Sequence, residues 1–178
     1  ALLSPLRLRE LELPNRIVVS PMCQYSAVDG CATNWHLVHL GQYAVSGAGL
    51  VILEATHVER RGRITHGCLG LYSDENEAAL VRVVDFFRRH GHARLGIQIS
   101  HSGRKGSARR PWEGRGEALT AVEDAWRTVS ASELPFDEGW PQPEVLDADG
   151  MAAVREAFAQ STRRAARLTS VRRSTALM

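Results

Sequence analysis

The sequence has few cysteines, few aromatic residues and almost no excess of one sign of charge over the other. Its three cysteines, Cys23, Cys31 and Cys68, are odd in number and lack CxxC spacing, which disfavours a disulfide framework and a zinc ribbon. Basic and acidic residues number 22 and 20, so the net charge of +2 gives no electrostatic basis for binding nucleic acid or an anionic membrane. No apolar run is long enough to span a bilayer and no signal peptide precedes the first motifs, so we expect a cytoplasmic protein.

The residues that are present alternate between strand and helix patterns. Of the 178 residues, 44% are hydrophobic and 24% are charged, a mix typical of a globular domain that can bury a core. Two short apolar stretches within residues 6–13 predict a small hairpin. Apolar runs at 16–21, 50–53 and 95–99 then predict three buried strands.

Helix patterns separate these strands. Asn34 is the predicted cap of a first helix that ends before Gly47. A second helix follows Ser73 or Asp74 and carries apolar residues at helical spacing up to Phe87. A last helix begins after Asp147, beyond a segment rich in glycine and proline at residues 100–146.

The alternation predicts an α/β fold with a parallel sheet. Polar or unusual residues follow each strand, as expected for a barrel whose ligands bind at the carboxyl ends of its strands. A complete barrel needs roughly 250 residues, and this chain supplies about half of that. We therefore predict the N-terminal half of a (β/α)8 TIM barrel, with an N-terminal hairpin and a long loop after the third strand.

Ordered motifs lie at the ends of these strands. Ser-Pro-Met-Cys-Gln-Tyr-Ser occupies residues 20–26, Glu-Ala closes the second strand at 54–55, and Gln-Ile-Ser-His-Ser-Gly-Arg-Lys occupies 98–105. With Leu-Pro-Asn-Arg at 13–16 and Pro-Trp-Glu-Gly at 111–114, the chain resembles the Old Yellow Enzyme family over residues 5–168. These are FMN-dependent ene-reductases and NADH:flavin oxidoreductases, and the thermophilic-like branch is the best match.

The resemblance implies a flavin site and a reaction. NAD(P)H would reduce FMN, which would then reduce an activated alkene, a small enone-type substrate with an α,β-unsaturated carbonyl. Gln98 also has an argument of its own, because an amide buried unpaired in an apolar strand costs roughly 1–3 kcal/mol and the flavin edge offers it partners. The resemblance implies catalytic roles for Tyr25 and Cys23 and cofactor-binding roles for Pro21, Met22, Cys23, Ala55 and Gln98.

The likeness stops abruptly near the end of the chain. Residues 1–168 are predicted to form a partial flavin-binding barrel domain, and residues 169–178 an atypical tail. The family continues into a fourth strand with a histidine pair, and no such pair follows Leu168, as is typical of a frameshifted or truncated reading. An open half-barrel would leave strand edges unpaired, so we expect low stability, poor FMN affinity and association into a homo-oligomer.

Two other interpretations stay open at this stage. The chain could be a non-catalytic half-barrel fragment with impaired or no flavin binding. A zinc-dependent hydrolase using His36, His39 and a rim carboxylate such as Glu54 is the least favoured, because no third ligand is apparent and histidines at one-turn spacing are usually structural. We therefore predict no metal site.

Overall fold

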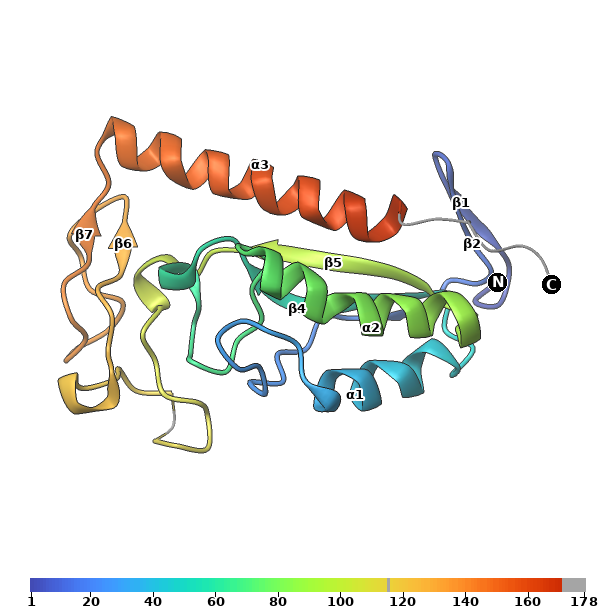
Figure 1. The fold of residues 1–178 in the computed structure, drawn as a ribbon, viewed down its shortest axis with the longest axis horizontal. Helices are drawn as coiled ribbons and strands as arrows, with labels where there is room; N and C mark the ends of the chain where they lie inside the picture. The colour runs from blue at the N-terminus through green and yellow to red at the C-terminus, as the bar shows by residue number, and fades with distance from the viewer. Residues whose placement is uncertain (115, 171–178) are drawn as a thin grey trace.

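The computed structural model describes residues 1–114 and 116–170 (Figure 1). Its first element is the predicted hairpin, formed by β1 (Leu6–Leu8) and β2 (Leu11–Leu13). The two strands pair antiparallel, with Leu6 opposite Leu13, and Arg9 adopts a positive φ of 53° in the turn. The hairpin lies at the end of the molecule opposite to β6 and β7, away from the carboxyl ends of the main strands.

The main sheet has three parallel strands in the order β3-β4-β5. They are β3 (Val18–Val19), β4 (Leu50–His57) and β5 (Arg94–Ser100). The prediction of a buried first strand is wrong, because β3 is only two residues long and Val18 is 46% exposed. Within the described residues β3 pairs only with β4, so one side of β3 has no neighbour to cover it.

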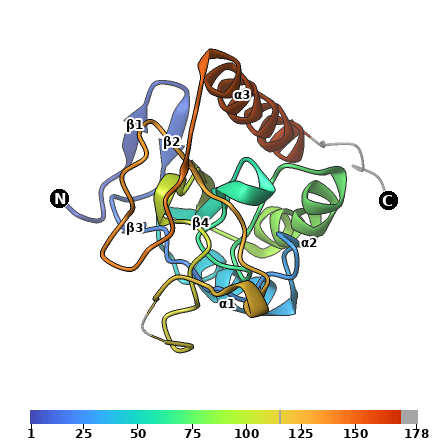
Figure 2. The same cartoon turned by 90° about the vertical axis from the view of Figure 1, so that its left-hand side faces the viewer.

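Three α-helices cover one face of this sheet: α1 (Asn34–Ala44), α2 (Asp74–His90) and α3 (Ala148–Ser170). Viewed from the carboxyl ends of the strands, they form an arc around β4 (Figure 2). The core fills the space between the helices and the sheet; its buried members include Leu40, Ala44, Val51, Leu53, Leu80, Val83 and Phe87. This is the arrangement expected of successive βα units of a barrel.

The helix ends follow from their capping residues. Ser73 caps α2 as predicted, since its hydroxyl accepts a hydrogen bond from the Asn76 backbone N–H at 3.2 Å. Asp147 likewise accepts from the Gly150 N–H at 2.7 Å at the start of α3. The prediction for α1 is wrong by one residue, because Thr33 rather than Asn34 is its N-cap and forms a reciprocal capping box with the residue three positions on.

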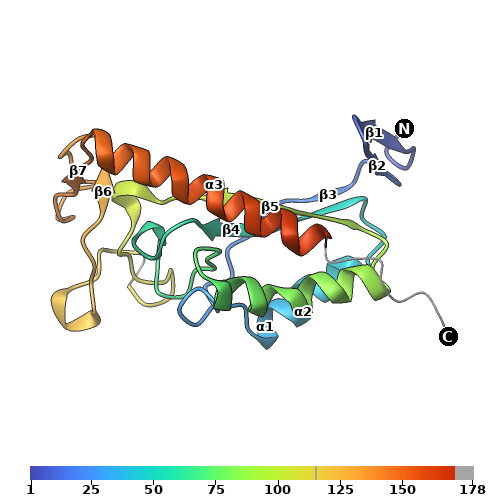
Figure 3. The ribbon, with the colours of Figure 1, turned by 45° about the horizontal axis from the view of Figure 1, so that its top comes forward.

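The long segment after β5 is a loop, as predicted, and it also contains local structure that the sequence pattern did not indicate. It contains the 3-10 turns η2 (Gly103–Lys105) and η3 (Ala121–Glu123) and a parallel pair, β6 (Val129–Ser130) and β7 (Glu144–Val145). A further turn, η1 (Arg60–Gly62), follows β4. All of these lie at the carboxyl ends of the sheet strands, opposite the hairpin (Figures 1 and 3).

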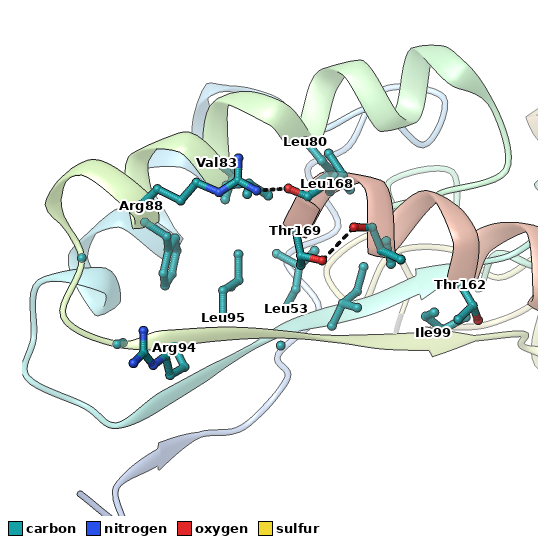
Figure 4. A pocket seen from close by; sticks show the side chains of 18 of the residues that line it. Leu53, Leu80, Val83, Arg88, Arg94, Leu95, Ile99, Thr162, Leu168 and Thr169 are labelled. Atoms are coloured by element: carbon teal, nitrogen blue, oxygen red, sulfur yellow. Dashed lines mark hydrogen bonds between the residues drawn. The ribbon is translucent and has the colours of Figure 1, made fainter. Parts of the chain in front are cut away.

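An apolar cavity of about 640 Å³ lies between α2, α3 and β5 (Figure 4). Ile97 and Ile99 of β5 face into it, and the side chain of Arg88 on α2 donates a hydrogen bond to the Leu168 carbonyl of α3. Ion pairs from Arg164 to Asp74 at 2.9 Å and from Arg167 to Glu77 at 2.6 Å also join the two helices. These contacts join the two helices that border the cavity.

Two sequence expectations meet the limits of the described chain. The atypical tail lies mostly outside the described residues, since α3 runs through Ser170 and residues 171–178 are not described. Within the part of the chain that is described, no helix combines the length and the hydropathy of a membrane-spanning segment.

Candidate functional site

The loop that follows β3, residues 20–26, is fastened to β4 by a buried carboxylate. Glu54 accepts a hydrogen bond from the Gln24 backbone N–H at 3.1 Å and is only 3% exposed. The Gln24 side chain in turn donates to the Met22 carbonyl at 2.8 Å and accepts from the Trp35 indole N–H at 3.0 Å. These bonds fix the path of the loop, and with it the positions of Pro21 to Tyr25.

A β-bulge in β4 sets which side chains share a face with Gln98. Leu53 pairs with Ile97, whereas the next pair in register is Ala55 with Gln98, so Glu54 is an extra residue in β4. Partners in a parallel ladder point to the same face of the sheet. The bulge therefore turns Glu54 toward α1, where its Oε1 lies 3.4 Å from His36 Nε2, and places Ala55 beside Gln98.

Cys23 lies next to this pair. Its thiol is half-buried and lies close enough to the Ala55 backbone for that backbone to act on its pKa. Burial raises the pKa of Cys23 to about 11, with Cys68 and Glu54 adding to the effect and the Ala55 N–H and Lys105 opposing it. The thiol is therefore protonated at neutral pH, which suits a polarizable contact to a ligand rather than nucleophilic attack.

The exposure of Gln98 differs from what the sequence predicted. Gln98 is exposed, so the premise that its amide is buried in an apolar strand is wrong. Its neighbours Ile97 and Ile99 face the helices, while Gln98 faces the open side of the sheet. Within residues 1–114 and 116–170 no hydrogen bond to its amide occurs, which leaves both the carbonyl oxygen and the NH2 group available to a ligand.

Tyr25 lies two residues after Cys23 with a positive φ of 52°. Burial raises the pKa of its phenol, and the nearby Cys23 raises it further. Its ring makes an edge-to-face contact with Trp112, with ring centroids 5.8 Å apart. The hydroxyl is therefore protonated at neutral pH and can donate a hydrogen bond.

The basic residues after β5 are used by the loop itself. His101 lies 3.0 Å from Glu59, and its other ring nitrogen accepts from the Gly103 N–H at 2.9 Å. Arg104 donates to the hydroxyls of Ser130 and Ser132, both at 3.0 Å. These contacts hold the long loop over the strand ends.

His57 is a residue at this rim that the sequence analysis missed. It pairs in register with Ser100 and is fully buried, and neither ring nitrogen has a hydrogen-bond partner among the described residues. Burial lowers the pKa of His57 to about 4, helped by the neighbouring charges of His101 and Arg63. The predicted strand ended at residue 53. Had it been extended to its true end, the alternation of side chains would have placed His57 on the same face as Ala55.

The histidines of the zinc hypothesis have structural partners. His36 is fully buried and its Nδ1 accepts a hydrogen bond from the Thr33 N–H at 3.0 Å. His39 packs edge-to-face on Tyr43 with centroids 5.3 Å apart. No group of three or more metal-binding side chains occurs in the described part of the chain.

Comparison with known proteins identifies relatives of this sequence and fold. The sequence model for the NADH:flavin oxidoreductase / NADH oxidase family matches residues 1–169. NADPH dehydrogenase of Listeria monocytogenes is 42% identical over 166 residues, covering 92% of this chain and 44% of that protein. NADH:flavin oxidoreductase FG08077 of Gibberella zeae is 35% identical over 167 residues, covering 92% of this chain and 40% of that protein.

Solved structures agree with the sequence relatives. Morphinone reductase superimposes with a TM-score of 0.76 at 26% identity, covering 94% of this chain and 45% of that one. The same enzyme in complex with tetrahydroNAD gives the same TM-score. The chain thus spans less than half the length of the proteins it matches.

Proposed function

Because this chain belongs to the NADH:flavin oxidoreductase / NADH oxidase family, we propose that it forms the FMN-contacting face of an NAD(P)H-dependent oxidoreductase. The proposed substrates are alkenes activated by a carbonyl group. One observation carries the proposal: the β4 bulge places Ala55 beside the amide of Gln98, which is unpaired among the described residues, and the Cys23 thiol lies near the Ala55 backbone. The names of the sequence and structural relatives support it.

The residues on this face suit a flat, heteroaromatic ring. Ala55 is small enough for a planar group to approach the backbone, and Gln98 can donate to and accept from the alternating polar atoms of a pyrimidine edge. Cys23 offers a neutral sulfur beside them, and Pro21 and Met22 precede it in the same loop. FMN, when bound, would supply the capacity to accept a hydride from NAD(P)H and to pass one to the alkene.

Tyr25 is the proposed polar contact to the substrate. A phenol holds its proton at neutral pH, and the raised pKa of Tyr25 extends this to higher pH, so the hydroxyl can donate a hydrogen bond to a carbonyl oxygen. Polarising the carbonyl makes the β-carbon of the alkene more electrophilic. We propose that Tyr25 orients the substrate while Cys23 contacts the cofactor.

A second candidate function is a half-barrel without catalytic activity. The observation that favours it is the two unpaired edges of the sheet, because β3 and β5 each pair only with β4 among the described residues. Such a fragment would bind FMN weakly or not at all, so FMN binding separates the two candidates.

The test is a titration of the full chain with FMN, in which the quenching of flavin fluorescence measures binding. We expect saturable binding that the substitution Gln98→Ala weakens about ten-fold, the effect of losing one or two hydrogen bonds. Gln142→Ala is the matched control, since Gln142 is an exposed glutamine whose amide bonds Glu133 in the long loop. Anaerobic NADPH or NADH should then bleach the bound flavin band. Absence of saturable binding would favour the non-catalytic fragment.

A further inference from the structure

Gly67 is the point at which Tyr25 and the long loop meet. A Cβ atom at this position would lie 2.2 Å from the Tyr25 carbonyl oxygen and 2.7 Å from Arg110 Nε. The Gly67 carbonyl also accepts a hydrogen bond from the Ala27 N–H at 2.9 Å. The backbone of Tyr25 and the side chain of Arg110 therefore both pack against the backbone of Gly67, where no side chain intervenes.

Arg110 begins a tight turn that carries Trp112. The Glu113 N–H donates to the Arg110 carbonyl at 2.9 Å, and the two side chains form an ion pair at 2.9 Å. Pro111 restricts the turn further by fixing its own φ. Trp112 follows Pro111 in this turn, which is joined to Gly67 through Arg110, so its distance from Tyr25 is set by contacts on both sides.

Trp112 is poorly covered for so large an apolar side chain. It is 65% exposed, and among the described residues its one ring contact is the edge-to-face pair with Tyr25, at an interplanar angle of 79°. A tryptophan held in place but left open is typical of a binding surface rather than of a core. The loop has a second aromatic pair, Phe136 with Trp140, whose centroids are 4.9 Å apart.

We propose that Trp112 is a specificity-determining residue, the outer wall of the slot in which Tyr25 binds the carbonyl of the substrate. The inference rests on the proposed function. Tyr25 would contact the polar end of the substrate and the indole its hydrocarbon part. Because an indole offers a broad flat surface, the slot favours a planar cyclic enone over a linear enone.

The test compares the binding of 2-cyclohexenone and of a linear enone, 3-penten-2-one, to the full chain with FMN. Binding is followed by the NMR resonance of the Trp112 indole N–H in the parent chain and by the Tyr25 ring resonances in every variant. Trp112→Ala should weaken 2-cyclohexenone binding about five-fold, the value of one aromatic contact, and leave the linear enone unchanged. Trp112→Phe should lose less than Trp112→Ala, and Trp140→Ala, the matched control in the same loop, should lose nothing.

Measuring FMN affinity in the same samples separates this inference from the proposed function. We expect Trp112→Ala to leave FMN affinity unchanged. Equal 2-cyclohexenone binding by Trp112→Ala and the parent chain would overturn the inference, and so would a parallel loss of FMN binding. If neither the parent chain nor any variant binds FMN, the proposed function fails. In that case a shift of the Trp112 resonance with 2-cyclohexenone but not with the linear enone would still support the inference about Trp112. No shift would overturn that inference.

Discussion

Cys23, Tyr25 and His57 are three titratable residues near the strand ends, and all three are uncharged at neutral pH. Burial is the largest cause of each pKa shift and moves the pKa further from neutrality, raising it for the thiol and the phenol and lowering it for the imidazole. Neutral groups suit the contacts that we propose for this rim, with a redox ring and an apolar substrate, because a buried charge would need a partner there. The first two residues carry the proposed chemistry, while His57 lies beneath the turn that follows β4.

His57 makes stability depend on pH. Its pKa is about 4 in the folded chain and 6.5 when unfolded, so the unfolded state binds this proton first as the pH falls. The contribution of His57 to the free energy of unfolding is therefore lost from about pH 6.5 down to about pH 4, and not below. From about pH 7 to about pH 5 the loss is about 2 kcal/mol.

Urea denaturation at several pH values measures this loss. His57→Gln should lose less stability than the parent chain over the same interval, because the glutamine does not titrate. His90→Gln, which alters an exposed histidine, should follow the parent curve. Identical pH slopes for the parent chain and His57→Gln would show that the imidazole is not buried in its neutral form.

How far residues can be predicted from sequence depends on whether their role is local. Ser73 and Asp147 were found as caps because a cap acts within three residues. The pairing of Ala55 with Gln98 was not predictable from alternation, because the bulge at Glu54 inserts a residue that no pattern marks. The resemblance implied roles for both residues, but the strand pattern alone would have put Ala55 on the wrong face.

At the scale of elements, the bulge in β4 connects the first two strands of the sheet to the site. Its extra residue, Glu54, holds the Gln24 backbone and lies beside His36 of α1. One carboxylate thus ties together β4, the loop after β3 and the start of α1. Cys23 is adjacent to Gln24 in that loop, so the position of its thiol depends on the same bond.

We predict that Glu54→Ala destabilises the chain by about 1–3 kcal/mol, because it leaves a Gln24 N–H without its acceptor. It should also speed alkylation of Cys23, since loosening the loop reduces the burial that raises its pKa and the substitution removes a nearby negative charge. Peptide mass spectrometry gives the rate at Cys23 separately from the other cysteines. Glu54→Gln keeps an accepting oxygen and should retain most of the stability; equal alkylation rates in Glu54→Ala and the parent chain would refute the link.

At the scale of the whole molecule, the described residues form a layer of α-helices on one side of a sheet whose other side carries no α-helix. The apolar cavity between α2, α3 and β5 adds an uncovered flank. The chain covers only 44% of its Listeria monocytogenes relative, and in the structural comparison it covers 45% of morphinone reductase. Uncovered apolar surface and strand edges favour association between molecules.

We therefore predict that the full chain associates in a concentration-dependent way. Thr162 is exposed on α3 and lines the cavity, so Thr162→Lys should place a charge at the associating surface and weaken association about ten-fold. Gln160→Lys adds the same charge to the same helix outside the cavity lining and should have little effect. Sedimentation equilibrium measures both. Unchanged association of Thr162→Lys would show that the cavity is not the associating surface.

The most direct test of the flavin face is a nuclear Overhauser measurement on the full chain mixed with FMN. Two surfaces could hold a flat ring, and they differ in chemistry. The face of the sheet with Ala55 and Gln98 offers a side-chain amide, whereas the cavity lined by Leu95 and Ile97 is apolar. We predict contacts from the ring protons of FMN to the Ala55 methyl group and to the Gln98 side-chain amide. Contacts to Leu95 and Ile97 instead, or no contacts at all, would contradict it.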